Sequence, residues 1–209
     1  MTRWLTIVGV ALPGLALAGF GLLHPHYLDA STARAWWTLH VWLIPVFPLI
    51  SVAIWVLLRG ERGPVAWAAR VAAYGFATFY TALDVLDGIG AGLVTDALHG
   101  GSPAVPWLFL IGDRVGATGV YCLFASAVLT GIVLIRRDGV RAVPGTVLLG
   151  AACYPFLQNH IFPPKGVLAM LAIAAGCALL AAAARPVTAS PPTESRPDGS
   201  HPDELLRGM

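Results

Sequence analysis

Residues 106–135 read PWLFLIGDRVGATGVYCLFASAVLTGIVLI and contain only two charged side chains, Asp113 and Arg114. A helix that crosses a bilayer needs about 20 consecutive, mostly apolar residues, so this block is long enough to span a membrane. In lipid every backbone donor and acceptor must pair within the protein, and the block does not alternate as a barrel strand does. We therefore expect a transmembrane helix here.

The rest of the chain repeats this pattern. Apolar blocks lie at roughly 4–23, 37–58, 65–94, 106–135, 143–158 and 166–184. The chain is 57% hydrophobic and 11% charged, with a mean hydropathy of +0.74, whereas soluble domains carry about 25% charged residues. We predict an all-α fold, a polytopic transmembrane helical bundle of about six spans over residues 1–185. Residues 186–209, rich in Pro, Ser and charge, are predicted to be a disordered cytoplasmic tail.

Charge and cysteine content exclude other classes of protein. The net charge is only +2 and the basic residues form no run, so we expect no nucleic-acid partner. Cys122, Cys153 and Cys177 each lie within an apolar block with no metal-binding spacing, which indicates small buried hydrophobic side chains. The expected partners are membrane lipid and a small or lipid-soluble ligand.

The distribution of Lys and Arg predicts the orientation, because positive residues are retained in cytoplasmic connections. Ten of the 13 fall on one side: Arg3, Arg59, Arg62, Arg70, Arg136, Arg137, Arg141, Arg185, Arg196 and Arg207. The opposite connections hold only Arg34 and Lys165. We therefore expect a multi-pass protein of the inner or plasma membrane with both termini in the cytoplasm.

The first block leaves an alternative open. Arg3, the apolar core and the small residues Ala16 and Ala18 also fit a cleavable signal peptide, although the apolar stretch continues through Leu23. The later spans keep the same predicted orientation in both cases.

With this orientation, most polar residues of the spans fall near the outer surface. His24, His26 and His99 lie in outer connections, and His40 and His160 lie near outer span ends. Asp84, Asp87 and Asp113 lie in the outer halves of the third and fourth spans. We predict that these side chains share one layer and form an outward-facing intramembrane pocket.

The carboxylates outnumber the available positive partner. Asp84 and Asp87 are three residues apart and project from one helix face, with Tyr80 one turn below. Arg114 is expected to pair with one of these two aspartates, as a counter-ion or anion clamp. A buried charge is costly unless it is paired, so the surplus carboxylates need a proton, a histidinium or a metal.

A metal is the first functional hypothesis, because imidazole and carboxylate together are ligands for Zn, Fe, Mn or Cu. The predicted ligand set is His40, Asp84, Asp87, Asp113 and His160. Metal-dependent binding or catalysis on a small or lipid-soluble substrate would follow. His24 and His26 are a second, more exposed pair of candidate metal ligands. A haem held between His40 and His160 is a further possibility.

Two alternatives need no metal. Asp84, Asp87 and Asp113 are candidate catalytic acids and bases, with Arg114 beside them, in a cyclase or isomerase of an isoprenoid or lipid. A proton-coupled transporter using the same carboxylates is a third class. The inner halves of the third and fourth spans carry no acid, Lys or His below Asp84 and Arg114, which favours a pocket open to one face.

Overall fold

The structure, a computed structural model, describes residues 2–184 and consists of helices with no strand in that range. The helices are α1 (Arg3–Leu23), α2 (Ala33–Val46), α3 (Pro48–Leu57), α4 (Pro64–Leu83), η1 (Asp84–Gly90), α5 (Ala91–Ala97), α6 (Val105–Asp138), η2 (Gly139–Ala142), α7 (Val143–Asn159) and α8 (Lys165–Ala183). The predicted disordered tail, with His201, lies outside the described residues.

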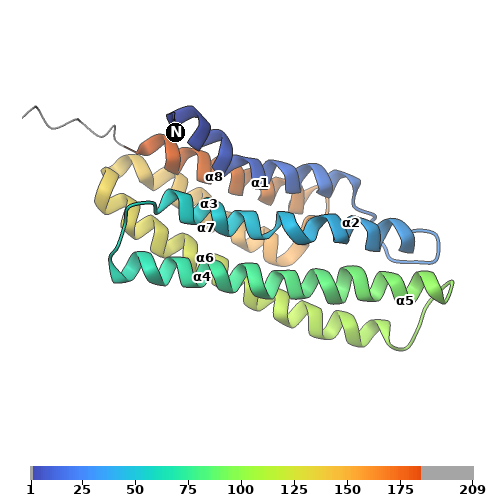
Figure 1. Cartoon of the computed structure of the whole chain (residues 1–209). Coiled ribbons are helices and arrows are strands. Elements are labelled where there is room, and N and C mark those ends of the chain that lie inside the picture. Colours follow the sequence, from blue (N-terminus) through green and yellow to red (C-terminus); the bar gives the residue numbers. More distant parts are fainter. Residues whose placement is uncertain (1, 185–209) are drawn as a thin grey trace, which may run out of the picture.

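Several short helices join into longer rods. Five helical units of the described chain are long and apolar enough to cross a membrane: Arg3–Leu23, Ala33–Leu57, Pro64–Ala97, Val105–Asn159 and Lys165–Ala183. The fourth unit contains α6 and α7, which run in opposite directions after a turn at η2 (Figure 1). The all-α membrane bundle of about six spans is therefore confirmed. The boundary of the helical domain at residue 185 stays a prediction.

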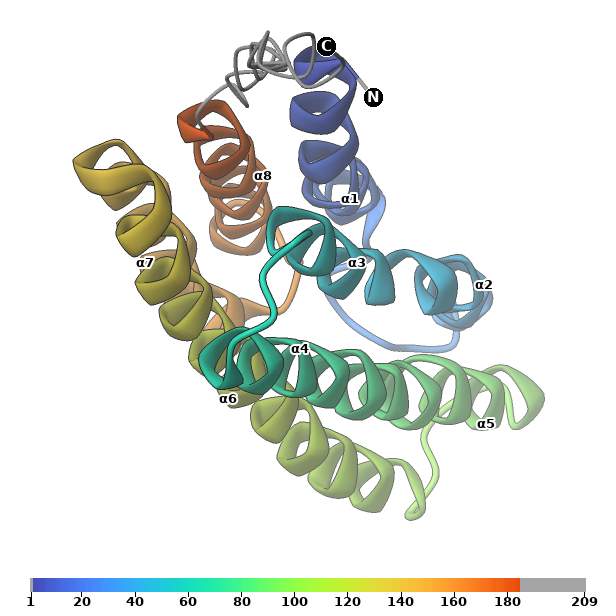
Figure 2. The same cartoon turned by 60° about the vertical axis from the view of Figure 1, so that its left-hand side comes forward.

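Small residues allow these rods to approach closely. α6 packs along α4, and α8 lies between α1 and α7 (Figure 2). A Cβ added at Gly119 of α6 would lie 3.1 Å from the backbone nitrogen of Tyr80, and one at Gly14 of α1 would lie 2.7 Å from the carbonyl oxygen of Met170. Glycine at such contacts lets backbones approach, as expected for helices packed within a bilayer.

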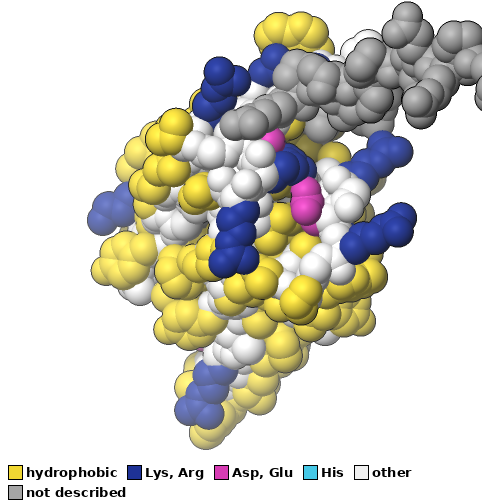
Figure 3. All heavy atoms as spheres, turned by 90° about the vertical axis from the view of Figure 1, so that its left-hand side faces the viewer, with side chains coloured by type: hydrophobic (Ala, Val, Ile, Leu, Met, Phe, Trp, Pro, Cys, Tyr) yellow, Lys and Arg dark blue, Asp and Glu magenta, His cyan; other side chains and the backbone are white. Residues whose placement is uncertain are grey.

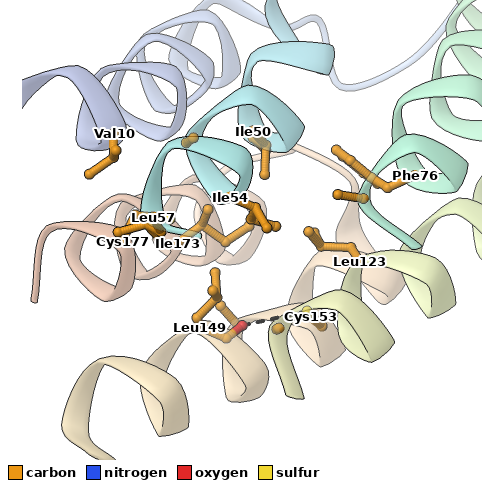
Figure 4. Close-up of a cluster of buried hydrophobic side chains, with 14 of the residues drawn as sticks. Val10, Ile50, Ile54, Leu57, Phe76, Leu123, Leu149, Cys153, Ile173 and Cys177 are labelled. Carbon is orange, nitrogen blue, oxygen red and sulfur yellow. Dashed lines mark hydrogen bonds between the residues drawn. The ribbon is translucent and has the colours of Figure 1, made fainter. Parts of the chain in front are cut away.

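The core between the rods is apolar. Ile54 of α3, Phe76 of α4, Leu123 of α6 and Leu149 of α7 are each fully buried and point toward one another (Figure 4). Cys153 and Cys177 belong to this core and Cys122 is half-buried, with all cysteines as free thiols, close to the sequence interpretation.

Positive charge gathers at one end of the bundle. Figure 3 faces the end at the left of Figure 1 and shows Lys and Arg side chains around its rim. Arg137 lies there, at the end of α6, and pairs with Asp138 at 2.8 Å and with Glu61 at 3.4 Å. The connections that carry most of the basic residues are thus grouped at one end of the bundle, as the sequence predicts. Which side of the membrane that end faces stays a prediction.

The opposite end is stepped. α2, α5 and the first turns of α6 extend beyond the ends of α1 and α7 (Figure 1). The residues that directly follow α1 and α7, His24 and His160, therefore lie beside the longer rods, where His24 is buried and His160 is half-buried.

Candidate metal centre

Three histidines from different helices meet at this step. His24 follows the last turn of α1, His40 lies within α2, and His160 follows the last turn of α7. One ring nitrogen from each lies within 4.8 Å of the others. His24 and His40 are 4% and 2% exposed, so water reaches neither ring freely. We call His24, His40 and His160 the histidine cluster.

Hydrogen bonds fix which nitrogens of His24 and His40 face the centre. Nδ1 of His24 lies 2.7 Å from the carbonyl oxygen of Pro25, and Nδ1 of His40 lies 2.8 Å from that of Trp36. A carbonyl oxygen only accepts, so each Nδ1 donates its proton there. In the neutral ring the other nitrogen, Nε2, then carries a lone pair, and the two Nε2 atoms lie 3.5 Å apart.

His160 has the same arrangement, except that the partner of its Nδ1 is a side chain. Its Nδ1 lies 2.6 Å from the hydroxyl oxygen of Tyr80 on α4, and its Nε2 is buried without a hydrogen-bond partner. When Nδ1 donates to Tyr80, the Nε2 lone pair is free. His160 has a backbone φ of +47°, a conformation that non-glycine residues rarely adopt and that tends to occur at functional sites.

Aromatic rings enclose the cluster and hold it in place. Phe162 packs 4.4 Å from His24 and Trp36 packs 4.8 Å from it, measured between ring centroids. Tyr80 stacks on His160 at 5.7 Å. The apolar walls lower the local dielectric constant, which strengthens any electrostatic interaction inside them.

Burial keeps the two loop histidines uncharged. It lowers the pKa of His24 to about 4; the hydrogen bond to the Pro25 carbonyl opposes this shift in part, and repulsion from His26 adds to it. Burial also holds the pKa of His160 well below its usual range, and His24 and His40 lower it further. Both rings are thus neutral near pH 7, which is the form that binds metals.

A π-helical segment, η1, contains Asp84 and Asp87 and packs against the cluster at Gly88. The ring of His40 packs directly against Gly88, where any side chain would collide with it. The indole nitrogen of Trp36 donates to the backbone carbonyl of Asp87 at 3.0 Å. Widened turns of this kind are frequent at functional sites, because they redirect side chains and free carbonyl groups.

Asp84 and Asp87 are both buried, and their oxygens are poorly satisfied. Asp84 is 0% exposed and neither of its carboxyl oxygens has a hydrogen-bond partner. Oδ1 of Asp87 also lacks one, and the Asp87 carboxyl packs against Gly112 of α6. In the sequence Asp84 lies between Tyr80, which contacts His160, and Gly88, which contacts His40.

Asp113 lies at a neighbouring cavity. This cavity has a volume of about 420 Å³, and Tyr80, Asp113, Asn159 and His160 are among the residues that line it. We call it the polar cavity. Most of its lining comes from α6 and α7, and His160 is the member of the histidine cluster that it reaches.

The predicted pairing of Arg114 is wrong. Arg114 is exposed and forms no ion pair with Asp84 or Asp87 among the described residues. Gly112, Gly116 and Gly119 form the face of α6 that meets α4, and Arg114 lies about 200° around the helix from Gly112. Its guanidinium group is therefore directed away from the two aspartates.

Some of the other predicted site residues meet in the structure, and others are exposed. His40 and His160 do meet, and the additional member is His24, which the sequence suggested only as part of a more exposed pair with His26. His26 and His99 are exposed. Whether Asp84, Asp87 or Asp113 takes part in metal binding stays a prediction.

The sequence feature that could have assigned His24 to the site is its position after the last turn of an apolar helix. That position is visible in the sequence, but the inward direction of its ring is not.

No protein-family model, curated protein or solved structure matches this chain.

Proposed function

We propose that this chain is an integral membrane protein that binds a divalent transition metal through Nε2 of His24, His40 and His160. Metal-dependent binding or catalysis on a small or lipid-soluble substrate follows as its function. The proposal is supported by the convergence of two buried imidazoles and one half-buried imidazole, whose ring nitrogens lie within 4.8 Å of one another in a largely apolar bundle.

One observation carries the proposal most directly. Each ring of the histidine cluster has its Nδ1 at a hydrogen-bond partner: Pro25, Trp36 or Tyr80. Metal-binding histidines almost always donate their second nitrogen in this way, because it fixes the ring and its tautomer. Facing lone pairs 3.5 Å apart in a buried site are unfavourable unless a cation lies between them.

The donor set restricts the metal and its chemistry. Imidazole nitrogens suit Zn, Cu and Fe, and three protein ligands with an open position are typical of catalytic rather than structural zinc sites. Such a metal supplies Lewis-acid chemistry and lowers the pKa of a bound water. Asp84, a buried carboxyl whose two oxygens have no hydrogen-bond partner, is the candidate proton acceptor.

Elemental analysis of the full chain, purified in detergent without chelators, tests the proposal. We expect one metal per chain, and its loss in His24→Gln, His40→Gln and His160→Gln. His26→Gln is the matched control, because His26 is exposed in the same loop as His24. A folded protein that takes up no Zn, Cu, Fe or Mn when these ions are supplied would rule the proposal out.

A metal-free membrane enzyme is the second candidate. It is favoured by the buried carboxyl oxygens of Asp84 and Asp87 that have no partner, since such groups can hold and transfer a proton. In this case Asp113 acts from the polar cavity. A metal-free preparation that retains an isoprenoid or lipid and converts it, with loss of conversion in Asp84→Asn, would support this candidate over the first.

A further inference from the structure

A second hollow adjoins the polar cavity and differs from it in chemistry. It has a volume of about 390 Å³ and runs between α6 and α7, where Phe124, Gly150, Cys153 and Tyr154 line it. We call it the α6–α7 groove. Its lining is apolar apart from the tyrosine hydroxyls, and Phe124 and Tyr154 are 48% and 72% exposed, so the groove is open along its outer side.

The two hollows adjoin each other. Val120, Tyr121 and Leu157 line both of them. Along α7 the combined lining extends from Gly150 to Asn159, and nine residues of helix rise roughly 14 Å. Because α6 and α7 run antiparallel (Figure 1), the polar cavity lies toward the histidine cluster and the groove toward the middle of the bundle.

The polar end restricts the kind of group that it can hold. Tyr80 offers a hydroxyl, Gln158 and Asn159 offer amides, and Asp113 offers the one carboxyl group among the residues that line the cavity. Asp113 makes no ion pair within the described chain and disfavours an anion beside it. An uncharged group that both donates and accepts hydrogen bonds, such as a hydroxyl, fits this lining.

We propose that the polar cavity and the α6–α7 groove together bind one amphiphile, with an uncharged hydroxyl-bearing head in the cavity and a single apolar chain in the groove. The assignment of this molecule as the substrate rests on the proposed function, because the head then lies beside Tyr80 and His160 of the metal centre. The graded lining distinguishes the site from an ordinary lipid-facing surface, which would be apolar along its full length.

The test uses hexadecanol that carries a photoreactive diazirine, added to the full chain in phospholipid nanodiscs. A diazirine at the end of the chain should label Phe124 and Tyr154, and one next to the hydroxyl should label residues nearer Asn159. The corresponding hexadecanoic acid should label these residues much less. Even labelling of all lipid-facing helices, or equal labelling by the acid, would overturn the proposal.

A glycine substitution supplies the matched variant. A Cβ added at Gly150 meets only the edge of the Phe124 ring, at 3.9 Å, so Gly150→Leu can fill the groove without a backbone clash. It should lower labelling about tenfold, the effect of roughly 1.4 kcal/mol of lost binding. Gly19→Leu is the control, because Gly19 on α1 has no atom within 4 Å of its Cβ position and lies outside both hollows.

Metal content measured on the same samples separates the two proposals. Specific labelling of a protein that binds no metal would remove the metal-dependent function and leave the amphiphile site. Even labelling of a protein with a full complement of metal would remove the amphiphile site alone. If Gly150→Leu does not fold, the shift of labelled residues between the two diazirine positions still decides the question in the unmodified chain.

Discussion

The Nε2 atoms of His24 and His40 lie 3.5 Å apart, while each ring donates its other nitrogen to a backbone carbonyl. In this arrangement two lone pairs face each other in a buried site. A metal ion held by these histidines, as we propose, would relieve this repulsion, so the native state should bind metal far more strongly than the unfolded chain does.

Added Zn²⁺ should therefore stabilise the metal-free protein. A ligand that binds only the native state stabilises it by about 2.7 kcal/mol at a concentration 100 times its Kd. Thermal unfolding in detergent, with and without Zn²⁺, measures this effect. The increase in Tm should disappear in His40→Gln and persist in His26→Gln, and an equal increase in both variants would contradict a site at the histidine cluster.

The low pKa of His24, about 4, predicts an acid-dependent loss of stability in the metal-free protein. The unfolded chain protonates this histidine near pH 6.5 and the folded protein only near pH 4. Between these values the unfolded state binds more protons, so the free energy of unfolding falls as the pH falls, by up to roughly 3 kcal/mol over the window.

Histidine NMR signals at a series of pH values, together with unfolding at pH 7 and pH 5, check this prediction. His24→Gln should show a weaker dependence of stability on pH. A His24 ring that titrates near its ordinary value would show that water reaches it.

The bundle was predictable from sequence because the bilayer imposes it. Long apolar blocks leave the backbone only a helical solution in lipid, and the glycines of α6 indicate close packing. The division of the fourth apolar unit at η2 was also visible, since Arg136 and Arg137 interrupt it.

The site was predictable only in part, because depth in the membrane does not give direction around a helix. His40 and His160 were expected at one level, and they do meet. His24 was underestimated because two histidines beside a proline look alike in sequence, although only one points inward. Arg114 was misplaced because adjacency to Asp113 says nothing about which side of α6 meets α4.

Tyr80 should tune the metal site without binding the metal. Tyr80→Phe removes the hydroxyl that lies 2.6 Å from Nδ1 of His160 and leaves the stacked ring in place. Loss of such an outer partner typically lowers metal affinity 10- to 100-fold. Competition with a chelator of known affinity measures the change. Tyr74→Phe, at an exposed position of α4, is the control and should not change the affinity. Equal affinities of Tyr80→Phe and the unmodified protein would show that the hydrogen bond does not support the site.

The orientation predicted from the arginines can be tested with an impermeant maleimide on intact cells. In a background without native cysteines, Tyr27→Cys in the loop after α1 should be labelled, because Tyr27 is 79% exposed at the histidine end. Arg62→Cys, in the connection between α3 and α4, should be labelled only after the cells are opened. The reverse pattern would place the histidine cluster toward the cytoplasm.

Two buried aspartates should respond in opposite ways to the same substitution. Neither carboxyl oxygen of Asp84 has a hydrogen-bond partner. Asp138, in contrast, forms an ion pair with Arg137, in which Oδ2 lies 2.8 Å from a guanidinium nitrogen. A buried polar group without a partner costs about 1–3 kcal/mol, so Asp84→Leu should stabilise the metal-free protein by an amount of that order. Asp138→Leu should destabilise it, because it leaves Arg137 without its closest carboxylate. Unfolding in mixed detergent micelles measures both effects. A protein destabilised by both substitutions would indicate that Asp84 has a structural partner, and its assignment as a group kept for function would then fail.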